Sequence, residues 1–387
     1  MSAAPNIPFA RPWVTDDDRK AVLEVLDGHI LTHGPQGQAF ETEFAQFLGD
    51  GAFCVSVSSC MAALHLAYLH FRIGPGDEVI VPAQTHVATV HAVEWVGATP
   101  VFVDCDPRTG NLTAEKIAPH ITARTKAISV VHFVGIPCQM PAIMALASRY
   151  GLLVIEDCAI AVGSRYQGRH VGLFGDAGCF SFYPVKHLTT GEGGMFVSRH
   201  REVAEAVGRL RAFGVDRSYT ERSMPGMYDV PSLGLNYRMS ELQAALGVAQ
   251  LRRVHENLDR RRTNFARLKS AFVHMPHVSI LDSDDPCSTN SHYCLSLVLD
   301  GPLAKRRDEA VAKINGAGIG TSVYYPKPVS QMIYYRNKYG EAGHAVPEAS
   351  RLSRQSMALP VGPHLREEDI GYIAKTVATI IGGLTHE

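Results

Sequence analysis

Short apolar runs alternate with segments of helical periodicity over the first half of the chain. The apolar runs predict strands, and the segments between them carry apolar residues three and four positions apart, as one face of a helix does. Strands that alternate with helices are typical of a mostly parallel sheet with helices on both faces. The predicted strands, in chain order, are FCVSVSS, EVIVP, PVFVD, AISVVHFVG and LLVIED.

Two helices are predicted before this alternating region. The first begins at Asp16, where Thr15 can cap the helix and the following acidic residues favour its positive end, and it continues to about Leu26. A loop rich in glycine separates it from a second predicted helix over 40–48.

The pattern changes after residue 194. A strand MFVS is followed by a predicted helix over 202–213 and by one long helix from Ser240 to about Ala271. The runs HYCLSLVLD and INGAGIGTSVYY predict strands around a helix, and an amphipathic helix follows Arg366. We therefore predict a large α/β domain over 1–250 and a small C-terminal α+β domain over 251–387.

Composition narrows the class of protein. The 387 residues carry 37 Lys and Arg against 38 Asp and Glu, so a formal net charge of −1 gives no field that would attract nucleic acid. No run approaches the roughly 20 apolar residues of a membrane span, and the N-terminus lacks the pattern of a signal peptide. The eight cysteines form no C-x-x-C pair, and no His motif indicates a metal. A cytoplasmic protein is the expectation.

Two segments contain candidate functional side chains. The strand LLVIED ends in Glu156 and Asp157, and ligands of open α/β sheets bind beyond the carboxyl ends of the strands. Further along, Lys186 stands between apolar neighbours and a Gly-Glu-Gly-Gly turn in CFSFYPVKHLTTGEGGMF. Partial desolvation lowers the pKa of a lysine, and the neutral amine can attack a carbonyl group to form a Schiff base.

The segment that contains Lys186 resembles the cofactor-lysine signature of DegT-type nucleotide-sugar aminotransferases, which have the aspartate-aminotransferase fold. Further segments of this family, including its perosamine-synthase-like members, match in order and spacing from about residue 8 to 375. The matching segments are SFYPVK (181–186), LTTGEGG (188–194), LTHGP (31–35), GPGDEVIVP (74–82), VGATPVFVD (96–104), ED (156–157) and LNYRM (235–239).

The resemblance implies a fold-type I enzyme that depends on pyridoxal phosphate. Lys186 would hold the cofactor as an internal aldimine and move protons as general acid and base, and Asp157 would bind the pyridine nitrogen. Ser181 would bind the cofactor phosphate together with main-chain N–H groups at the start of the helix after FCVSVSS. Asn236 would reach the phosphate of the neighbouring subunit. The implied assembly is therefore a homodimer with shared active sites.

The implied reaction moves an amino group from glutamate or glutamine to a nucleotide-activated keto sugar, a 4-keto-6-deoxyhexose by preference. Two half-reactions with a Schiff-base mechanism would accomplish it. Two alternatives stay open: a pyridoxal-phosphate-dependent keto-sugar dehydratase, and a noncatalytic regulatory homologue that binds the cofactor.

Some positions depart from the family pattern. The usual Ser-Gly-Thr phosphate turn reads Ser59-Cys60-Met61, which keeps the backbone donors but loses the threonine hydroxyl. His86 replaces the aromatic residue that stacks on the pyridine ring, and a histidine ring can still stack. Ile160 replaces a Gln or Glu near the phenolic oxygen of the cofactor, and it cannot form a hydrogen bond.

Two further positions concern the substrate and the reaction. Tyr324 stands where the family commonly has the histidine of a His-Tyr-Pro sequence, at a substrate contact. His187 directly follows Lys186, and a dehydratase branch of the family has histidine in place of the cofactor lysine. The spacing from Ser181 assigns the cofactor position to Lys186, so we interpret His187 as a structural neighbour.

Overall fold

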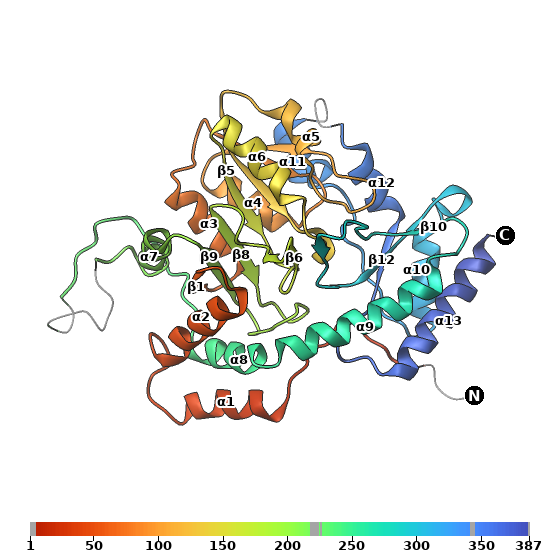
Figure 1. Cartoon of the computed structure of the whole chain (residues 1–387), viewed down its shortest axis with the longest axis horizontal. Helices are drawn as coiled ribbons and strands as arrows, with labels where there is room; N and C mark the ends of the chain where they lie inside the picture. The colour runs from red at the N-terminus through yellow and green to blue at the C-terminus, as the bar shows by residue number, and fades with distance from the viewer. Residues whose placement is uncertain (1–4, 217–223, 225–226, 341–344, 386–387) are drawn as a thin grey trace.

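The computed structural model describes residues 5–216, 224, 227–340 and 345–385. A seven-stranded sheet lies at its centre in the order β1-β9-β8-β5-β4-β2-β3 (Figure 1). Only β9 runs antiparallel to its neighbours in this sheet, which confirms the predicted α/β fold with a mostly parallel sheet. The strands are β1 (Phe53–Val57), β2 (Glu78–Pro82), β3 (Thr99–Val103), β4 (Thr125–Val131), β5 (Leu153–Asp157), β8 (Ala177–Ser181) and β9 (Gly194–Ser198).

Helices cover both faces of the sheet (Figure 1). Successive residues of a strand point to opposite faces, so Val81 and Ile155 join the apolar cluster of α3 and α4. Their neighbours Ile80 and Val154 join the cluster of α6 on the other face. The helices of this part are α1 (Asp16–Leu26), α2 (Pro35–Leu48), α3 (Cys60–His70), α4 (Val87–Trp95), α5 (Ala114–Ile117), α6 (Met140–Tyr150) and α7 (Arg201–Leu210).

Helix α2 begins at Pro35 and not at the predicted residue 40. The fixed φ of proline suits the first helical position. The carboxylate of Glu241 accepts hydrogen bonds from the first N–H groups of the helix, those of Gln36 at 2.7 Å and Gly37 at 3.0 Å. This cap comes from a residue far along the chain, so the local pattern could not indicate the start.

The predicted long helix from Ser240 is wrong, because the structure has two helices there. They are α8 (Glu241–Leu251) and α9 (Val254–Phe272), and the chain turns between them at Arg253. The guanidinium of Arg253 reaches back to the buried Asp18 and to the carbonyl of Trp13, which is a contact between distant segments. α8 packs on α1 and α2, whereas α9 packs on α13. The domain boundary at 250 and 251 stays a prediction.

A smaller group of elements follows α9. Strands β10 (Val278–Ile280), β12 (Leu295–Leu299) and β13 (Ser356–Leu359) form an antiparallel sheet, and α10 (Arg307–Gly316) and α13 (Glu367–Leu384) pack against it. The second predicted strand, within INGAGIGTSVYY, is wrong: this stretch ends α10 and then forms isolated bridges at Ile319 and Ser322. The remaining elements are β6 (Arg165–Tyr166), β7 (Arg169–His170), β11 (Ser288–Thr289), α11 (Ile333–Tyr339) and α12 (Pro347–Gln355).

Candidate active site

The carboxyl ends of β5 and β8 gather most of the predicted site residues. Asp157 is the last residue of β5, and Ser181 is the last residue of β8. Cys60 begins α3, and His86 directly precedes α4. Because parallel strands end at the same edge of the sheet, these side chains converge there.

Asp157 is buried and has several hydrogen-bond donors. The Thr89 hydroxyl donates to Oδ2 at 2.7 Å, and the Ala159 N–H donates to Oδ1 at 3.0 Å. The Cys60 thiol lies 3.7 Å from the same Oδ1. Burial, and then the negative charge of Asp157, raises the pKa of Cys60, so the sulfur keeps its proton and can donate it. The carboxylate is therefore held in one orientation.

Lys186 lies in the loop after β8, close to the same carboxylate. Burial lowers the pKa of this lysine, and the negative charge of Asp157 acts in the opposite direction. The Nζ atom lies over the ring of Tyr293, 5.4 Å from the ring centroid. Lys186 is thus the partly enclosed amine that the sequence predicts.

The N-terminus of α3 forms a cradle beside Ser181. Ser59 caps the helix, because its Oγ accepts the N–H of Ala62. The N–H groups of Cys60 and Met61 belong to the first turn, where no intrahelical acceptor exists. Gly194 lies opposite Ser181 in the sheet, and a Cβ on it would come within 2.4 Å of the Ser59 carbonyl carbon. The glycine therefore lets strand β9 approach the helix end, where an anion is favoured.

His86 holds its ring near the lysine. Its Nδ1 accepts the N–H of Ala88 at 3.2 Å, and its ring centroid lies 5.6 Å from that of Tyr325. Burial lowers the pKa of His86, and the charge of Lys186 adds to this effect. A neutral, flat ring is therefore positioned at the site.

Two further predicted residues, Ile160 and Asn236, differ in their surroundings. The side chain of Ile160 is 3% exposed and belongs to the main apolar core, while its carbonyl accepts a hydrogen bond from Ser291. Asn236 is exposed and pairs through its backbone with Ala212. Among the described residues, no hydrogen bond or ion pair joins Asn236 to Lys186 of the same chain.

Tyr324 contacts a second tyrosine, Tyr293, which lies next to Lys186. Its hydroxyl lies 2.9 Å from the hydroxyl of Tyr293, whose ring faces Lys186. The sequence interpretation missed Tyr293 and Thr89. Thr89 stands four residues after Thr85, and both are buried. This pairing of small polar residues could have indicated a role near the strand end.

His187 is a structural residue in this fold. It is buried, its Nε2 donates to the carbonyl of Ser291 at 3.1 Å, and its own carbonyl accepts from Asn257 at 2.7 Å. Burial, and then the charge of Arg261, holds the pKa of His187 well below its usual value. A neutral imidazole in this network positions the chain next to Lys186.

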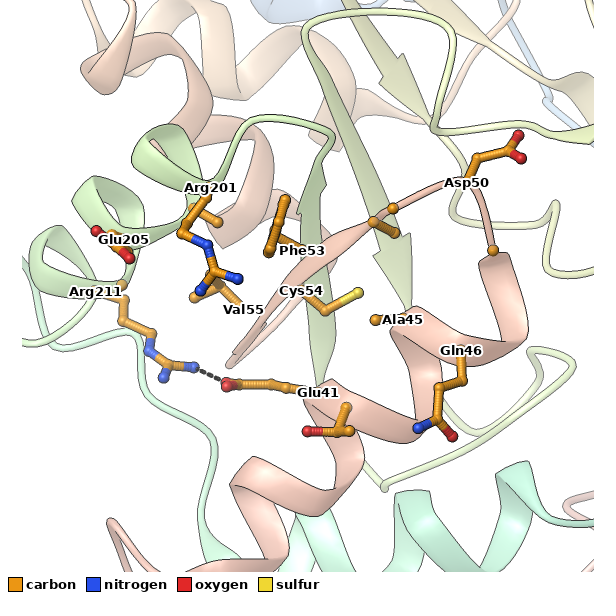
Figure 2. Close-up of a pocket in the computed structure, with 16 residues that line it drawn as sticks. Glu41, Ala45, Gln46, Asp50, Phe53, Cys54, Val55, Arg201, Glu205 and Arg211 are labelled. Atoms are coloured by element: carbon orange, nitrogen blue, oxygen red, sulfur yellow. Dashed lines mark hydrogen bonds and ion pairs between the residues drawn. The ribbon is translucent and has the colours of Figure 1, made fainter.

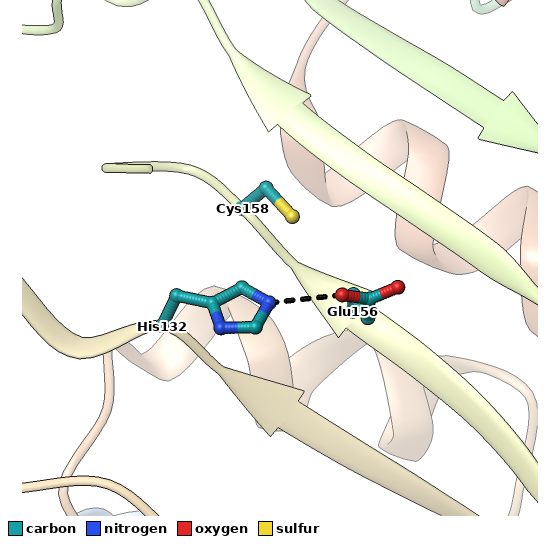
Figure 3. A group of neighbouring side chains, drawn as sticks. All are labelled: His132, Glu156 and Cys158. Atoms are coloured by element: carbon teal, nitrogen blue, oxygen red, sulfur yellow. Dashed lines mark hydrogen bonds and ion pairs between the residues drawn. The ribbon is translucent and has the colours of Figure 1, made fainter. Parts of the chain in front are cut away.

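His132, Glu156 and Cys158 form a compact buried group that could suggest a metal site (Figure 3). The Nδ1 atom of His132 accepts the N–H of Cys138, so Nε2 carries the proton and donates it to Glu156 at 3.1 Å. Both ring nitrogens are therefore used, and no lone pair is left for an ion. Glu156 also accepts backbone N–H groups of Gly172 and of residues 174 and 175, which secures the chain beside β5.

A groove of about 730 Å³ lies elsewhere, along the free edge of β1 between α2 and α7 (Figure 2). There Glu41 accepts the N–H of Ser56 at 2.8 Å and pairs with Arg211 at 2.6 Å. Charged side chains that cap an edge strand protect it from pairing with another chain. Neither Lys186 nor Asp157 lines this groove, so it is separate from the candidate site.

The site fits pyridoxal phosphate in three respects. Lys186 offers an amine, Asp157 offers a buried carboxylate for a ring nitrogen, and the start of α3 with Ser181 offers donors for a phosphate. An α/β fold with this set at the carboxyl ends of its strands defines the class of pyridoxal-phosphate-dependent enzymes of fold type I. These residues therefore fit the cofactor that the sequence predicts.

Comparison with known proteins identifies the family. The sequence model of the DegT/DnrJ/EryC1/StrS aminotransferase family matches residues 12–378. The chain therefore belongs to this family, and it is a pyridoxal-phosphate-dependent aminotransferase. The resemblance predicted from the sequence is confirmed.

Relatives of known name match this chain over nearly its whole length. The spore coat polysaccharide biosynthesis protein SpsC of Bacillus subtilis is 36% identical over 381 residues, 97% of each chain. Among solved structures, the Helicobacter pylori aminotransferase PseC, involved in pseudoaminic acid biosynthesis, has a TM-score of 0.92 at 27% identity and covers 98% of this chain and 100% of its own. The PLP form of the putative sugar aminotransferase Spr1654 of Streptococcus pneumoniae has a TM-score of 0.91 at 28% identity and covers 98% and 99%. These relatives group the chain with sugar aminotransferases.

Proposed function

We propose that this enzyme transfers the amino group of glutamate or glutamine to the ketone of a nucleotide-activated sugar, a 4-keto-6-deoxyhexose by preference. The observation that carries the proposal is the pair formed by the partly enclosed Lys186 and the buried Asp157 at the carboxyl ends of the strands. The names of PseC and SpsC, which concern the biosynthesis of pseudoaminic acid and of spore coat polysaccharide, support a sugar as the amino acceptor.

Each residue of the pair has a distinct proposed role. Pyridoxal phosphate, when bound, supplies an electron sink for the carbon that loses a proton. Asp157 stabilises the protonated ring nitrogen by its charge, and its fixed orientation keeps that interaction aligned. Lys186 holds the cofactor and then, as a free amine, moves the proton as general base and acid. Its lowered pKa makes the neutral, proton-accepting amine available.

The phosphate end and the ring have their own contacts in this proposal. Ser181 and the N–H groups of Cys60 and Met61 bind the phosphate, because the helix end favours an anion. His86 covers one face of the pyridine ring. Tyr324, which is hydrogen-bonded to Tyr293, contacts the sugar substrate.

We propose a homodimer in which Asn236 binds the cofactor phosphate of the partner subunit. The chain on either side of residues 217–226 extends away from the body of the molecule (Figure 1). Apolar side chains there are exposed, with Leu233 93% and Val230 51% exposed. Exposed apolar patches mark interaction surfaces. A second copy of this chain that covers this segment would bring Asn236 to its own site.

The proposed location is the cytoplasm. All eight cysteines lie within the described residues, and each is a free thiol, which fits a reducing compartment. In the part of the chain that the structure describes, no helix has the length and apolar character needed to cross a membrane.

The decisive experiment measures turnover with a panel of nucleotide-linked keto sugars and with glutamate or glutamine as donor. Transamination releases the 2-oxo acid of the donor and gives a product that has gained nitrogen, as mass spectrometry can show. Loss of sugar oxygen without gain of nitrogen would favour the dehydratase. Cofactor binding without release of 2-oxo acid would favour a noncatalytic regulator.

The Lys186→Ala variant tests the role of the lysine in the same assay. We expect it to lose turnover and the absorbance at ~420 nm of lysine-bound cofactor. Lys126→Ala, at an exposed lysine of β4, is the matched control and should keep both. Full amine transfer by Lys186→Ala would overturn the proposal.

A further inference from the structure

Several titratable groups face Lys186 from the surrounding elements. The negative charge of Asp157 at the end of β5 favours its charged form, and the thiols of Cys60 at the start of α3 and Cys294 before β12 also lie near it. The two histidines His86 and His187 also lie within electrostatic reach. Burial is the largest influence, and it disfavours the ammonium ion.

The aromatic ring of Tyr293 is the group that Nζ of Lys186 directly overlies. The 5.4 Å separation between Nζ and the ring centroid is within the range of a cation–π interaction, which stabilises an ammonium ion most where water is excluded. Tyr293 is only 4% exposed, and burial raises the pKa of its hydroxyl well above the ordinary value. The ring is therefore neutral and presents an uncharged π face to the lysine.

Tyr293 is held at both ends. Its hydroxyl lies 2.9 Å from that of Tyr324, and the two rings are nearly perpendicular, with an interplanar angle of 74°. Its carbonyl oxygen accepts a hydrogen bond from the buried guanidinium of Arg261 at 3.0 Å. The ring therefore has little freedom to turn away from the lysine.

The same network also holds the loop of Lys186. Arg261 donates through Nε to Asn257 at 2.9 Å, one turn earlier in α9, and Asn257 donates to the carbonyl of His187 at 2.7 Å. Two residues of one helix thus bind both the backbone of Tyr293 and the residue next to Lys186. Helix α9 sets the position of the ring relative to the amine.

We propose that Tyr293 is a positioning residue for Lys186, and that its ring face stabilises the protonated form of the amine. This inference rests on the proposed role of Lys186 as acid and base. A lysine that accepts a proton from carbon and later returns one must be able to exist in both forms. Burial favours the neutral form, and the ring of Tyr293 acts together with the charge of Asp157 to favour the protonated form.

The test compares the acidity of Lys186 in three apoenzymes, so it needs neither cofactor nor substrate. An amine reagent reacts only with the neutral lysine, and peptide mass spectrometry follows the labelling rate of Lys186 against pH. Tyr293→Phe keeps the ring and should leave the midpoint unchanged. Tyr293→Leu removes the ring and should lower the midpoint by about one pH unit, the shift that a desolvated cation–π interaction produces.

The outcomes test the role of the Tyr293 ring separately from the proposed transamination. An unchanged or raised midpoint in Tyr293→Leu would overturn the role of the ring, whatever the turnover assay shows. A lowered midpoint in Tyr293→Phe as well would assign the effect to the hydroxyl pair with Tyr324 and would also overturn it. Lys126, labelled in the same samples, should keep its midpoint. Tyr293→Met, whose long apolar side chain fills the space, replaces the leucine variant if that variant does not fold.

Discussion

The hydroxyl of Thr89 donates a hydrogen bond of 2.7 Å to Oδ2 of Asp157. Both residues are buried, and the Thr85 hydroxyl lies 2.8 Å from that of Thr89. Because Thr89 uses its proton on the carboxylate, Thr85 must donate to Thr89. An ordered pair of hydroxyl groups therefore orients the carboxylate that is proposed to stabilise the cofactor ring.

Thr89→Val should remove this hydrogen bond to Asp157 while keeping the shape of the side chain. Hydrogen bonds to charged groups contribute about 1.5–3 kcal/mol, so the free energy of unfolding should fall by about that amount. Turnover should fall as well, because Oδ2 of the carboxylate loses this hydrogen bond and is less firmly oriented, while KM for the sugar should stay the same. Thr89→Ser keeps the hydroxyl and serves as control. Equal stability and turnover in the two variants would contradict the role of this bond.

Met61→Thr should strengthen cofactor binding. The half-buried Met61 stands in the first turn of α3, at the position where the family pattern has a threonine. A hydroxyl there adds a donor to a charged phosphate, so the cofactor Kd should fall about tenfold. Titration of apoenzyme with pyridoxal phosphate, followed by absorbance, measures the change. Met61→Leu is the control without a hydroxyl, and the idea fails if Thr and Leu behave alike.

Hybrid dimers should reveal whether the active sites are shared. Lys186→Ala removes the lysine, and Asn236→Asp places a negative charge where the partner's phosphate is expected. A hybrid of the two subunits contains one site with Lys186 and Asn236 both intact. Coexpression with two affinity tags isolates this hybrid, and its turnover should exceed that of either parent homodimer.

The outcome depends on which subunit Asn236 serves. If Asn236 acted within its own chain, both sites of the hybrid would be defective, and its turnover would lie between those of the two parent homodimers. A hybrid of two differently tagged Lys186→Ala subunits measures the background of the assay.

The order and type of most elements could be predicted because they are local properties, and so could the places of three candidate site residues in the fold, whose roles stay proposals. Asp157 and Ser181 directly end apolar strands, and parallel strands present their carboxyl ends at one edge of a sheet. Lys186 follows Ser181 in the loop after such a strand end. Sequence order alone therefore brings these three residues together.

Contacts between distant segments could not be predicted in the same way. The break between α8 and α9 depends on the bond of Arg253 with Asp18, and the start of α2 depends on Glu241. Tyr293 reaches Lys186 from the segment before β12, which no local pattern connects to β8. The contacts of such residues can be identified only when the tertiary structure is known.

His170 should make the enzyme sensitive to acid. It is fully buried, its Nε2 accepts the N–H of Gly163 at 2.8 Å, and its Nδ1 donates to the carbonyl of Val171 at 2.6 Å. The ring is therefore neutral, and a second proton on Nε2 would meet the Gly163 N–H. Burial lowers the pKa of His170 to about 3.

The sign of the effect follows from linkage. The unfolded chain binds a proton at His170 below about pH 6.5, whereas the folded chain does so only near pH 3, so the free energy of unfolding falls as the pH decreases between these values. Between pH 7 and 5 this one residue should account for a loss of about 2 kcal/mol. Urea unfolding of the apoenzyme at both pH values, at a fixed protein concentration, measures this loss.

His170→Gln should be less stable at pH 7, but its free energy of unfolding should fall by about 2 kcal/mol less on acidification, because glutamine does not titrate. His29→Gln, at an exposed histidine, should change with pH as the unmodified enzyme does. The same pH dependence in all three proteins would show that His170 takes up a proton in the folded state as readily as in the unfolded chain.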